Sequence, residues 1–392
     1  MTIFTRSLAV GVFAFCTTLA QAQTFETAAP AAYVYDQTTG TVLLAKNASV
    51  PLPPASMSKL MTIYMAFEAI AEGRMSIDDV LPVSTHAASF GGSSMFLDTT
   101  DRVRVEDLLR GVIVVSGNDS SVVLAEALSP DGTEAGFGRL MTERARQLGM
   151  NNTVLVNASG WPADGHVMSV EDLGILSSRL ITDFPTFYPL FAETEFAFDN
   201  RVPSNSQNRN PIMRMNIGAD GLKTGHTREA GYGLAGSAVQ GDRRVVFVIT
   251  GLETAQQRAE ESERIVNWAF RQFAERDVAA AGTRIATADV WMGTEQTVGL
   301  TVAEDLRLLV PVLHQGAVDG QVVFHGPVEA PVAAGQQVGE LIITLEGLPD
   351  KRVPLVADAD VPLGGFTARM RTAALVLWNK YGFAPGADAN GV

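Results

Sequence analysis

The sequence contains a single cysteine, and that cysteine lies close to the N-terminus. Cys16 falls inside an apolar segment, residues 8–19, which ends on a small-x-small sequence at 20–22. This order is typical of a secretory signal peptide, so we expect residues 1–22 to be removed by cleavage after Ala22. The mature chain then has no cysteine, which excludes a disulfide framework, a thiolate metal site and a catalytic thiol.

Basic residues are also scarce relative to acidic ones. The chain has 29 Lys and Arg against 43 Asp and Glu, a formal net charge of −14, and no long basic run. A nucleic-acid partner requires a concentrated basic face, so this balance argues against one. An apolar run of about 20 residues, the length that spans a membrane, is missing as well. The N-terminal apolar segment is shorter and is interrupted by Gly11.

The hydrophobic content of 46% is enough for a substantial core, and 392 residues are enough for two domains. β-prone runs open and close the first two thirds of the chain, and amphipathic segments fill the middle. We expect a hairpin around 38–40, a strand pair at 231–240 and 243–252, and helices from near 56 and at 105–117, 119–129, 133–149 and 255–276. Strands and helices do not alternate regularly, which argues against a doubly wound parallel sheet. The pattern predicts an α/β fold of the α+β type, with an antiparallel sheet flanked by helices.

The residue pattern changes near residue 280, where short β-prone runs separated by Gly and Pro begin. We therefore predict a catalytic domain at 23–278 and a smaller β-rich domain at 283–362. The histidines of the second part, His314 and His325, stand alone and are expected at the surface or on an edge strand.

The C-terminal segment 364–383 has the pattern of an amphipathic helix. It carries Arg369, Arg371 and Lys380 among apolar residues. A basic amphipathic helix can lie in a membrane interface, which would make this segment a peripheral membrane anchor. A helix packed on its own β domain fits the same pattern.

The first motif with a chemical meaning is S-x-x-K at Ser56 and Lys59, at the start of a predicted helix. A serine at such a place commonly caps the helix by accepting a backbone N–H bond. Alternatively, the lysine activates the serine as a nucleophile. Two fixed positions alone favour the capping interpretation.

Two further motifs follow in order. Ser116-Gly117-Asn118 forms an S-x-N motif after an apolar segment, and Lys223-Thr224-Gly225 forms a K-T-G motif directly before the strong strand pair. The set S-x-x-K, S-x-N, K-T-G is described for penicillin-binding proteins and related β-lactamases. Three matches in order, in a chain that we expect to be exported, reverse the preference and favour catalysis.

The sequence resembles the low-molecular-mass D-alanyl-D-alanine carboxypeptidases of the penicillin-binding protein 5 and 6 type. The segments "ASMSKLMT", "GSSMFL", "NRNPIMRMNIGADGLKTGHT" and "RAEESERIVNWAF" carry this resemblance, which covers essentially the whole mature chain. It implies a β-lactamase/transpeptidase-like domain with a small C-terminal β domain. It also implies peptidoglycan pentapeptide stems as substrate, β-lactams as covalent inhibitors, and a periplasmic location, attached to the outer face of the inner membrane if the C-terminal helix anchors. No metal or other cofactor is required.

The resemblance implies roles for the motif residues. Ser56 would attack the carbonyl of the penultimate D-Ala and form an acyl-enzyme, with Lys59 as base. Lys59 must then be neutral part of the time, and burial, the helix N-terminus and a nearby Lys223 would each lower its pKa. Ser116 would relay the proton to the leaving amine.

Further residues would bind the substrate. Asn118 would hydrogen-bond the substrate amide or Lys59. Lys223, Thr224 and Arg258 would receive the terminal carboxylate, although Arg258 could instead pair with Glu260 or Glu261 on its own helix. The residues that complete the predicted site are Gly225, against which the substrate would lie, and the oxyanion-hole backbone N–H groups of Ser56 and His226.

Three alternatives remain open. A DD-endopeptidase that cuts peptide crosslinks differs only in whether the pocket demands a free terminal carboxylate. A β-lactamase would need a base for deacylation, for which Glu171 is a nominal candidate, although it fits better as the first turn of a helix capped by Ser169. A non-catalytic cell-wall scaffold is disfavoured by the intact motifs. His226 is not expected to be a triad base, because the chain has no G-x-S-x-G elbow.

Overall fold

The computed structural model describes residues 25–312, 318, 320–345, 348, 350–370, 372 and 374. The predicted signal peptide therefore lies outside the described residues, as do His314 and much of the segment 364–383. The first domain contains β1 (Ala31–Asp36), β2 (Thr41–Lys46), the 3-10 turn η1 (Ala55–Ser58), α1 (Lys59–Ala71), β3 (Val80–Pro82), α2 (Thr85–Ala88), β4 (Arg102–Arg104), α3 (Val105–Ile113), α4 (Asn118–Leu128), α5 (Glu134–Gln147), α6 (Val170–Asp183), β5 (Ala219–Thr227), β6 (Gly231–Gln240), β7 (Arg243–Leu252) and α7 (Ala255–Arg271).

The first domain is built on one five-stranded antiparallel sheet. Its strand order is β2-β1-β7-β6-β5, so the first and last parts of the domain meet at the β1–β7 pair. The predicted antiparallel sheet and its hairpins are confirmed, and β6 and β7 have the predicted bounds. The K-T-G motif lies on β5, which is the edge strand.

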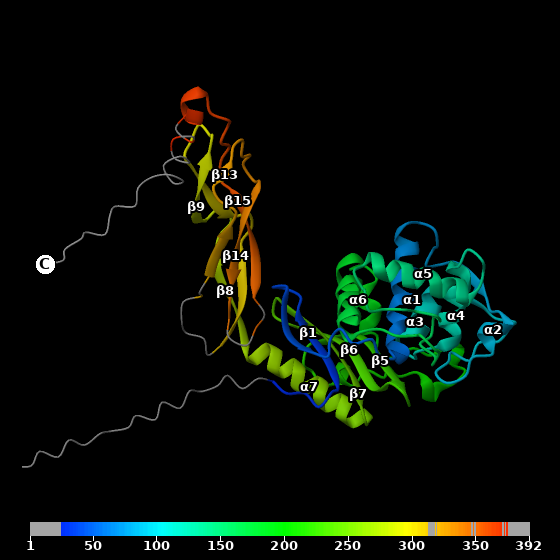
Figure 1. Cartoon of the computed structure of the whole chain (residues 1–392). Helices are drawn as coiled ribbons and strands as arrows, with labels where there is room; N and C mark the ends of the chain where they lie inside the picture. Colours follow the sequence, from blue (N-terminus) through cyan, green and yellow to red (C-terminus); the bar gives the residue numbers. More distant parts are fainter. Residues whose placement is uncertain are drawn as a thin grey trace, which may run out of the picture.

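Helices cover both faces of this sheet (Figure 1). Alternation along β1 decides which side chain meets which layer, since successive strand residues point to opposite faces. Ala31 and Tyr33 belong to the core shared with α1 and the helices around it. Ala32 and Val34 belong to the core under α7. The sheet is therefore buried on both faces. The helix α1, whose first residue is Lys59, packs on the face that carries Ala31 and Tyr33.

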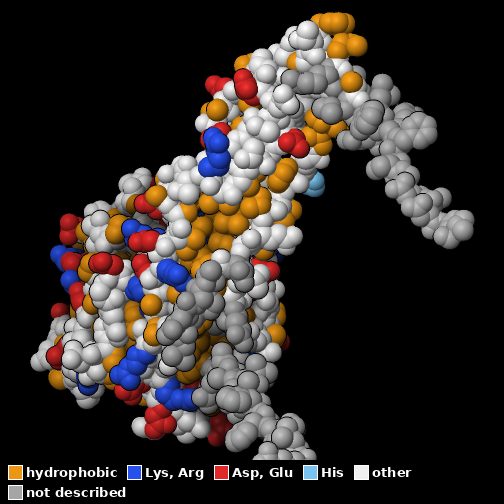
Figure 2. Space-filling model, turned by 90° about the vertical axis from the view of Figure 1, so that its left-hand side faces the viewer, with side chains coloured by type: hydrophobic (Ala, Val, Ile, Leu, Met, Phe, Trp, Pro, Cys, Tyr) orange, Lys and Arg blue, Asp and Glu red, His pale blue; other side chains and the backbone are white. Residues whose placement is uncertain are grey.

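The second domain is an elongated β structure that follows α7 (Figure 1). Its strands are β8 (Phe273–Ala279), β9 (Arg284–Trp291), β10 (Thr297–Val302), β11 (Leu306–Pro311), β12 (Gly320–Phe324), β13 (Val328–Glu329), β14 (Gln337–Ile343) and β15 (Lys351–Ala357). Six of them form a sheet in the order β12-β14-β15-β10-β9-β13, and β8 pairs with β11. The domain projects from the larger one, with hydrophobic side chains gathered along its flank (Figure 2).

Two predicted helices end earlier than expected. The helix predicted at 255–276 ends at Arg271, and residues from Phe273 onward form β8, where pairing with β11 overrides the local pattern. The helix predicted at 105–117 ends at Ile113. Ser116 has a positive φ of 62°, which no helix accommodates, and a new helix starts at Asn118.

Among the described residues, none of the helices combines the length and the apolar character that crossing a membrane requires. Residues 366–370, 372 and 374 are helical, so the start of the predicted C-terminal helix is present. His325 is exposed, in line with its predicted surface position.

Candidate active site

The first motif lies where η1 passes into α1. Ala55 precedes Ser56 with a positive φ of 48°, a conformation that costs free energy for a residue other than glycine. Lys59 is the first residue of α1, and its Nζ lies 3.0 Å from the Ser56 Oγ. No side chain caps η1 or α1 at its N-cap position. The serine therefore faces the lysine, and the capping interpretation is wrong.

Lys59 is completely buried, yet it forms no ion pair within the described residues. Besides Ser56, its Nζ donates to the Asn118 Oδ1 at 2.7 Å and to the Ser159 backbone carbonyl. Burial, together with the nearby positive charge of Arg209, lowers the pKa of Lys59 to about 7. A substantial fraction of this lysine is thus neutral at neutral pH and able to accept a proton.

The second lysine is paired with the second serine in the same way. The Lys223 Nζ donates to the Ser116 Oγ at 2.9 Å and to the Thr224 carbonyl at 3.2 Å. Lys223 is only 2% exposed, and burial, followed by the charges of Lys59 and Arg209, holds its pKa well below the usual value for lysine. The site thus contains two lysine–serine pairs, both in low-dielectric surroundings.

Asn118 is held in place by the segment 91–97. Its backbone N–H donates to the Ser93 carbonyl at 2.7 Å, and its Nδ2 donates to the Gly91 carbonyl at 2.8 Å. The next residue, Asp119, accepts bonds from the Ser94 Oγ at 2.6 Å and from two backbone N–H groups of the same segment. The Asn118 Oδ1 is therefore directed at Lys59, as one of the two predicted roles requires.

The K-T-G strand lies directly against the nucleophile turn. A Cβ at Gly225 would be 3.0 Å from the Pro54 carbonyl oxygen and 3.0 Å from the Met57 side chain. A side chain here would press on the nucleophile turn, so glycine allows the close packing of β5 on η1. The Thr224 side chain is buried beside it. The next residue, His226, is exposed, and its ring stacks on Tyr232 with centroids 3.8 Å apart.

Arg258 approaches the same region from α7. It is only 8% exposed, and its guanidinium lies 5.7 Å from the Tyr232 ring centroid. Its buried Nε has no hydrogen-bond partner among the residues that the structure describes. Glu260 instead accepts a bond from Gln256, and Glu261 pairs with Arg264. The alternative in which Arg258 pairs with a glutamate of its own helix is therefore wrong for the described residues.

Arg209 is a site residue that the sequence reasoning did not single out. Its charge lowers the pKa values of Lys59, Lys223 and Arg258, and its guanidinium donates to Ser93 and, at 3.1 Å, to Asn205. The two serine–lysine pairs thus lie within the electrostatic influence of two arginines, Arg209 and Arg258. The only signal in the sequence was the "NRN" segment at 208–210.

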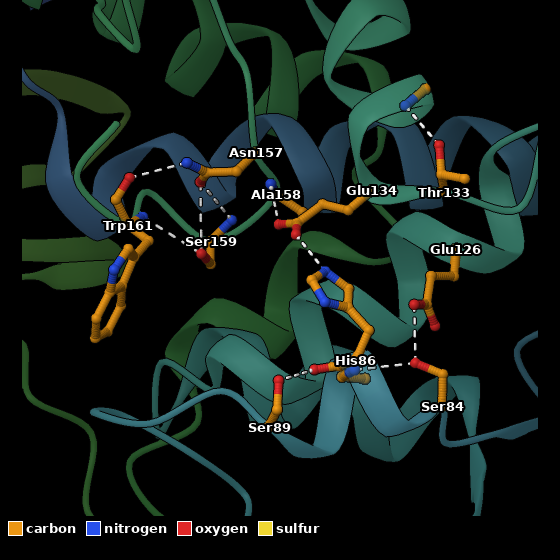
Figure 3. A network of polar contacts seen from close by, with 12 residues as sticks. Ser84, His86, Ser89, Glu126, Thr133, Glu134, Asn157, Ala158, Ser159 and Trp161 are labelled. Carbon is orange, nitrogen blue, oxygen red and sulfur yellow. Dashed lines mark hydrogen bonds and ion pairs between the residues drawn. The ribbon is translucent and has the colours of Figure 1, made fainter. Parts of the chain in front are cut away.

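Ser159, whose backbone carbonyl accepts a bond from Lys59, lies on a loop with its own supports (Figure 3). The Asn157 Oδ1 accepts bonds from the N–H groups of Ser159 and Gly160 at 3.2 and 2.8 Å. Glu134 accepts the Ala158 N–H at 3.0 Å and pairs with the His86 Nε2 at 2.9 Å. A backbone carbonyl leaves no mark in the sequence, so this contact could not be predicted.

Glu171 takes part in a helix start. It lies in the first turn of α6, and Ser169 caps this helix by accepting the Asp172 N–H at 3.0 Å. The Glu171 Oε2 accepts a bond from Ser49 at 2.9 Å. The interpretation of Glu171 as a helix-start residue is confirmed.

A buried serine–lysine pair, a second serine–lysine pair and an edge strand with K-T-G define a serine enzyme of the penicillin-binding class. Comparison with known proteins agrees with this class. The family "D-alanyl-D-alanine carboxypeptidase" matches residues 17–254, and "Penicillin-binding protein 5, C-terminal domain" matches residues 273–363. The chain belongs to the serine-type D-alanyl-D-alanine carboxypeptidase family, as its motifs predicted. The domain boundaries 23–278 and 283–362 stay predictions.

Individual relatives extend over nearly the whole chain. The D-alanyl-D-alanine carboxypeptidase DacC of Escherichia coli is 34% identical over 353 residues, which cover 88% of this chain and 87% of the relative. DacF of Bacillus subtilis is 30% identical over 90% of each chain. The crystal structure of penicillin-binding protein 5 from Haemophilus influenzae superposes with a TM-score of 0.75 at 32% identity, covering 86% of this chain and 98% of that one.

Proposed function

We propose that the chain removes the terminal D-Ala from peptidoglycan stem peptides that end in D-Ala-D-Ala, through an acyl-enzyme on Ser56. The contact between the Lys59 Nζ and the Ser56 Oγ at 3.0 Å, with Lys59 buried and its pKa lowered to about 7, carries this proposal. A neutral lysine at this distance can accept the hydroxyl proton as the oxygen attacks.

In the acylation step, the Ser56 Oγ bonds to the carbonyl carbon of the penultimate D-Ala, and its proton moves to the Lys59 Nζ. The negative charge that develops on the carbonyl oxygen is stabilised by the backbone N–H groups of Ser56 and His226. Because β5 packs against the nucleophile turn, these two groups come from adjacent elements.

Collapse of the intermediate breaks the peptide C–N bond. The Ser116 hydroxyl donates its proton to the leaving nitrogen and takes up in return the proton that Lys59 received from Ser56, so that Lys59 is neutral again. The Lys223 Nζ, 2.9 Å from the Ser116 Oγ, holds this hydroxyl in place. Water then attacks the ester carbonyl, which releases the shortened stem and returns a proton to the Ser56 Oγ. Asn118 keeps Lys59 directed at Ser56 during both steps.

Recognition of a free terminal carboxylate falls to the cationic side chains. Lys223 and Thr224 lie on β5, and the buried Nε of Arg258 has no partner within the part of the chain that the structure describes. A buried guanidinium without an anion is costly, and a substrate carboxylate would relieve that cost. This supports an exopeptidase over an endopeptidase, whose substrates lack the carboxylate at this point.

The rest of the stem has room beside the nucleophile turn. A cleft of about 410 Å³ is lined by Ala55, Trp161, His166, Thr227, Glu229 and neighbouring residues. Two of its lining residues adjoin the motifs: Ala55 precedes Ser56, and Thr227 ends the strand that carries K-T-G. We place the acyl side of the substrate here, and β-lactams, which acylate the same serine, at the same entrance.

The test is D-alanine release from a muramyl pentapeptide by the mature protein. We expect release by the wild-type protein, and a loss of at least about 10³-fold in Ser56→Ala, because the nucleophile is removed. Ser76→Ala, which removes the hydroxyl of an exposed serine outside the site, is the matched control. Failure of the wild-type protein to release D-alanine, while it still binds penicillin covalently, would contradict the proposal and favour an endopeptidase.

Arg258→Met separates these two activities further. We expect a fall of roughly 10²-fold in kcat/KM on the free-acid pentapeptide, since a charge-assisted bond to the carboxylate is lost. A terminally amidated peptide should be turned over poorly by both proteins. Equal rates on the acid and the amide in the wild-type protein would contradict the exopeptidase assignment.

We also propose that the chain is exported and acts in the periplasm, with its C-terminal segment touching the outer face of the inner membrane. Leu363, Phe366 and Met370 are exposed, and hydrophobic side chains lie at the far tip of the β domain (Figure 2). Co-sedimentation with phosphatidylglycerol vesicles should be retained by the full chain and lost on truncation after residue 363. Equal sedimentation of both proteins would contradict the membrane contact.

A further inference from the structure

A buried histidine that the reaction does not use lies directly behind the nucleophile. His166 is 4% exposed, and both of its ring nitrogens are engaged. The Nδ1 lies 3.1 Å from the Val156 backbone N, and the Nε2 lies 3.1 Å from the Ser58 Oγ. The Ser58 Oγ in turn lies 3.0 Å from the Ala55 carbonyl oxygen. Ser58 itself is 1% exposed, so the middle of this row of contacts is shielded from water.

The direction of every bond in this row can be deduced. A backbone N–H can only donate, so the His166 Nδ1 must accept from Val156. The proton of the neutral ring is then on the Nε2, which donates to the Ser58 Oγ. The Ser58 hydroxyl hydrogen is left for the Ala55 carbonyl, its only remaining acceptor in the row. Burial, together with the charge of Lys59, lowers the pKa of His166 to about 4, so the ring stays neutral at physiological pH.

The Ala55 carbonyl belongs to the same peptide group as the Ser56 N–H. A peptide group is planar and trans, so its C=O and N–H point in opposite directions. A bond that fixes the Ala55 oxygen on one side therefore sets the direction of the Ser56 N–H on the other. In the proposed reaction this N–H is one of the two donors of the oxyanion hole.

The conformation at this peptide group needs such support. Ala55 has a φ of 48°, in the left-handed region that costs free energy for alanine. The loop that carries His166 also presses on the same atoms: a Cβ on Gly160 would lie 2.0 Å from the Ala55 carbonyl oxygen and 2.7 Å from the Ser58 Oγ. The turn and the loop thus form one closely packed unit.

We propose that His166 is a positioning residue that directs the Ser56 N–H of the oxyanion hole, acting through the Ser58 hydroxyl and the Ala55 carbonyl. The inference rests on the proposed function for the identity of that N–H as an oxyanion donor. It adds that the loop at 156–166 contributes to catalysis without touching the substrate's reacting atoms.

Two substitutions of His166 separate its two bonds. In His166→Gln the amide Nε2 lies as many bonds from the backbone as the histidine Nε2, so the donor to Ser58 is kept and the acceptor for Val156 is lost. In His166→Asn the Oδ1 replaces the Nδ1, so the acceptor is kept and the donor is lost. Both variants remove the ring, and any effect of losing its volume is therefore shared. Ser58→Ala removes the next bond in the row.

The measurement is the pre-steady-state reaction with a fluorescent penicillin, because acylation uses the oxyanion hole whichever substrate is natural. The burst amplitude counts correctly folded sites, and the acylation rate constant reports the chemistry of those sites. We expect His166→Asn and Ser58→Ala to lower the rate constant roughly 10-fold at unchanged amplitude, since complete loss of an oxyanion donor costs about 10²–10³-fold. His166→Gln should stay within about threefold of the wild-type rate.

Combining His166→Asn with Ser58→Ala should cause no further loss, because both break one row of bonds. Rate constants that fall equally in His166→Gln and His166→Asn, or in neither, would overturn the proposal. A fall confined to the burst amplitude would assign His166 to folding alone and would also overturn it. D-alanine release is measured separately, so failure of the carboxypeptidase reaction would not be confused with failure of this inference.

Discussion

The two domains bury very different kinds of side chain. Within the described residues, the first domain buries some thirty polar or charged side chains, among them Lys59, Lys223 and Arg258, whereas the β domain buries Thr301 alone. Both domains have extensive apolar cores. Because burial of a charged group costs free energy unless it is compensated, the burial of Lys59, Lys223 and Arg258 without ion-pair partners among the described residues is explained by chemistry and not by stability.

Backbone strain is distributed in the same way. Among the residues that the structure describes, eight non-glycine residues have a positive φ. Seven of them lie in the first domain, and Met292 is the exception in the β domain. Two of the seven, Ala55 and Ser116, adjoin or belong to the serine–lysine pairs. Such conformations persist where the surrounding structure determines them, which is the case behind Ser56. From this comparison we predict that substitutions in the β-domain core will lower stability and leave activity unchanged. Substitutions in the site of the first domain should change activity.

The largest expected effect on stability comes from the β-domain core. Leu355 is completely buried between β10 and β14, and Leu355→Ala should lower the free energy of unfolding of this domain by about 2–5 kcal/mol. Activity at 25 °C should be unchanged, since no site residue lies in this domain. Denaturant unfolding and kcat for D-alanine release check both points. A changed kcat in the folded variant would contradict the separation of roles.

The second prediction concerns acid. The pKa of His166 is about 4 in the folded chain and about 6.5 when unfolded, so the unfolded chain binds more protons between these values. Stability should therefore fall as the pH falls from about 6.5 to 4, by about 3 kcal/mol from this residue. Urea unfolding at a series of pH values should show a shallower slope in His166→Gln. Parallel slopes in the two proteins would contradict the shifted pKa.

The third prediction concerns stability at alkaline pH. The pKa of Lys59 is about 7 in the folded chain, below its unfolded value, so the unfolded chain binds more protons above pH 7. Stability should rise by about 2–3 kcal/mol between pH 7 and pH 9 from this residue, and Lys223 acts in the same direction. Lys59→Met should reduce the rise. The same urea titrations measure it, and a wild-type protein whose stability does not rise would argue against a buried, readily neutralised lysine.

The smallest effect is expected at Thr301, the exception in the β domain. Its Oγ1 lies 3.4 Å from the Val356 carbonyl, a long contact with little energy to lose. Thr301→Val should change the free energy of unfolding by less than about 1 kcal/mol, with no change in activity. A larger loss, measured by denaturant unfolding, would mean that the β domain also depends on a buried polar contact.

Local patterns predicted much of the fold correctly. The β-prone runs at 231–240 and 243–252 predicted the β6–β7 pair with its bounds. Ser169, the residue before α6, predicted the start of that helix. Predictions failed where distant residues decided the outcome. Phe273 continues a helical pattern, but its segment pairs with β11 across more than thirty residues, and the pairing prevails.

The candidate site shows the same division. The three motifs identified Ser56, Lys59, Ser116 and Lys223 because chemistry requires those side chains at fixed local spacings. Arg209 and the Ser159 carbonyl were missed, since an arginine in a long loop and a backbone oxygen have no pattern of their own. His166 was missed for a similar reason: its role depends on what its two nitrogens meet.

The sequence by itself determined the family, the serine–lysine chemistry, the antiparallel sheet and the presence of a second, β-rich region, because these depend on side-chain identity and local periodicity. Only the tertiary structure decided that Lys59 is buried enough to act as a base and that a histidine more than a hundred residues away contacts the nucleophile turn. It also decided that Arg258 has no glutamate partner among the described residues. Burial, charge proximity and hydrogen-bond direction arise between segments that are distant along the chain, so they exist only once the chain has folded.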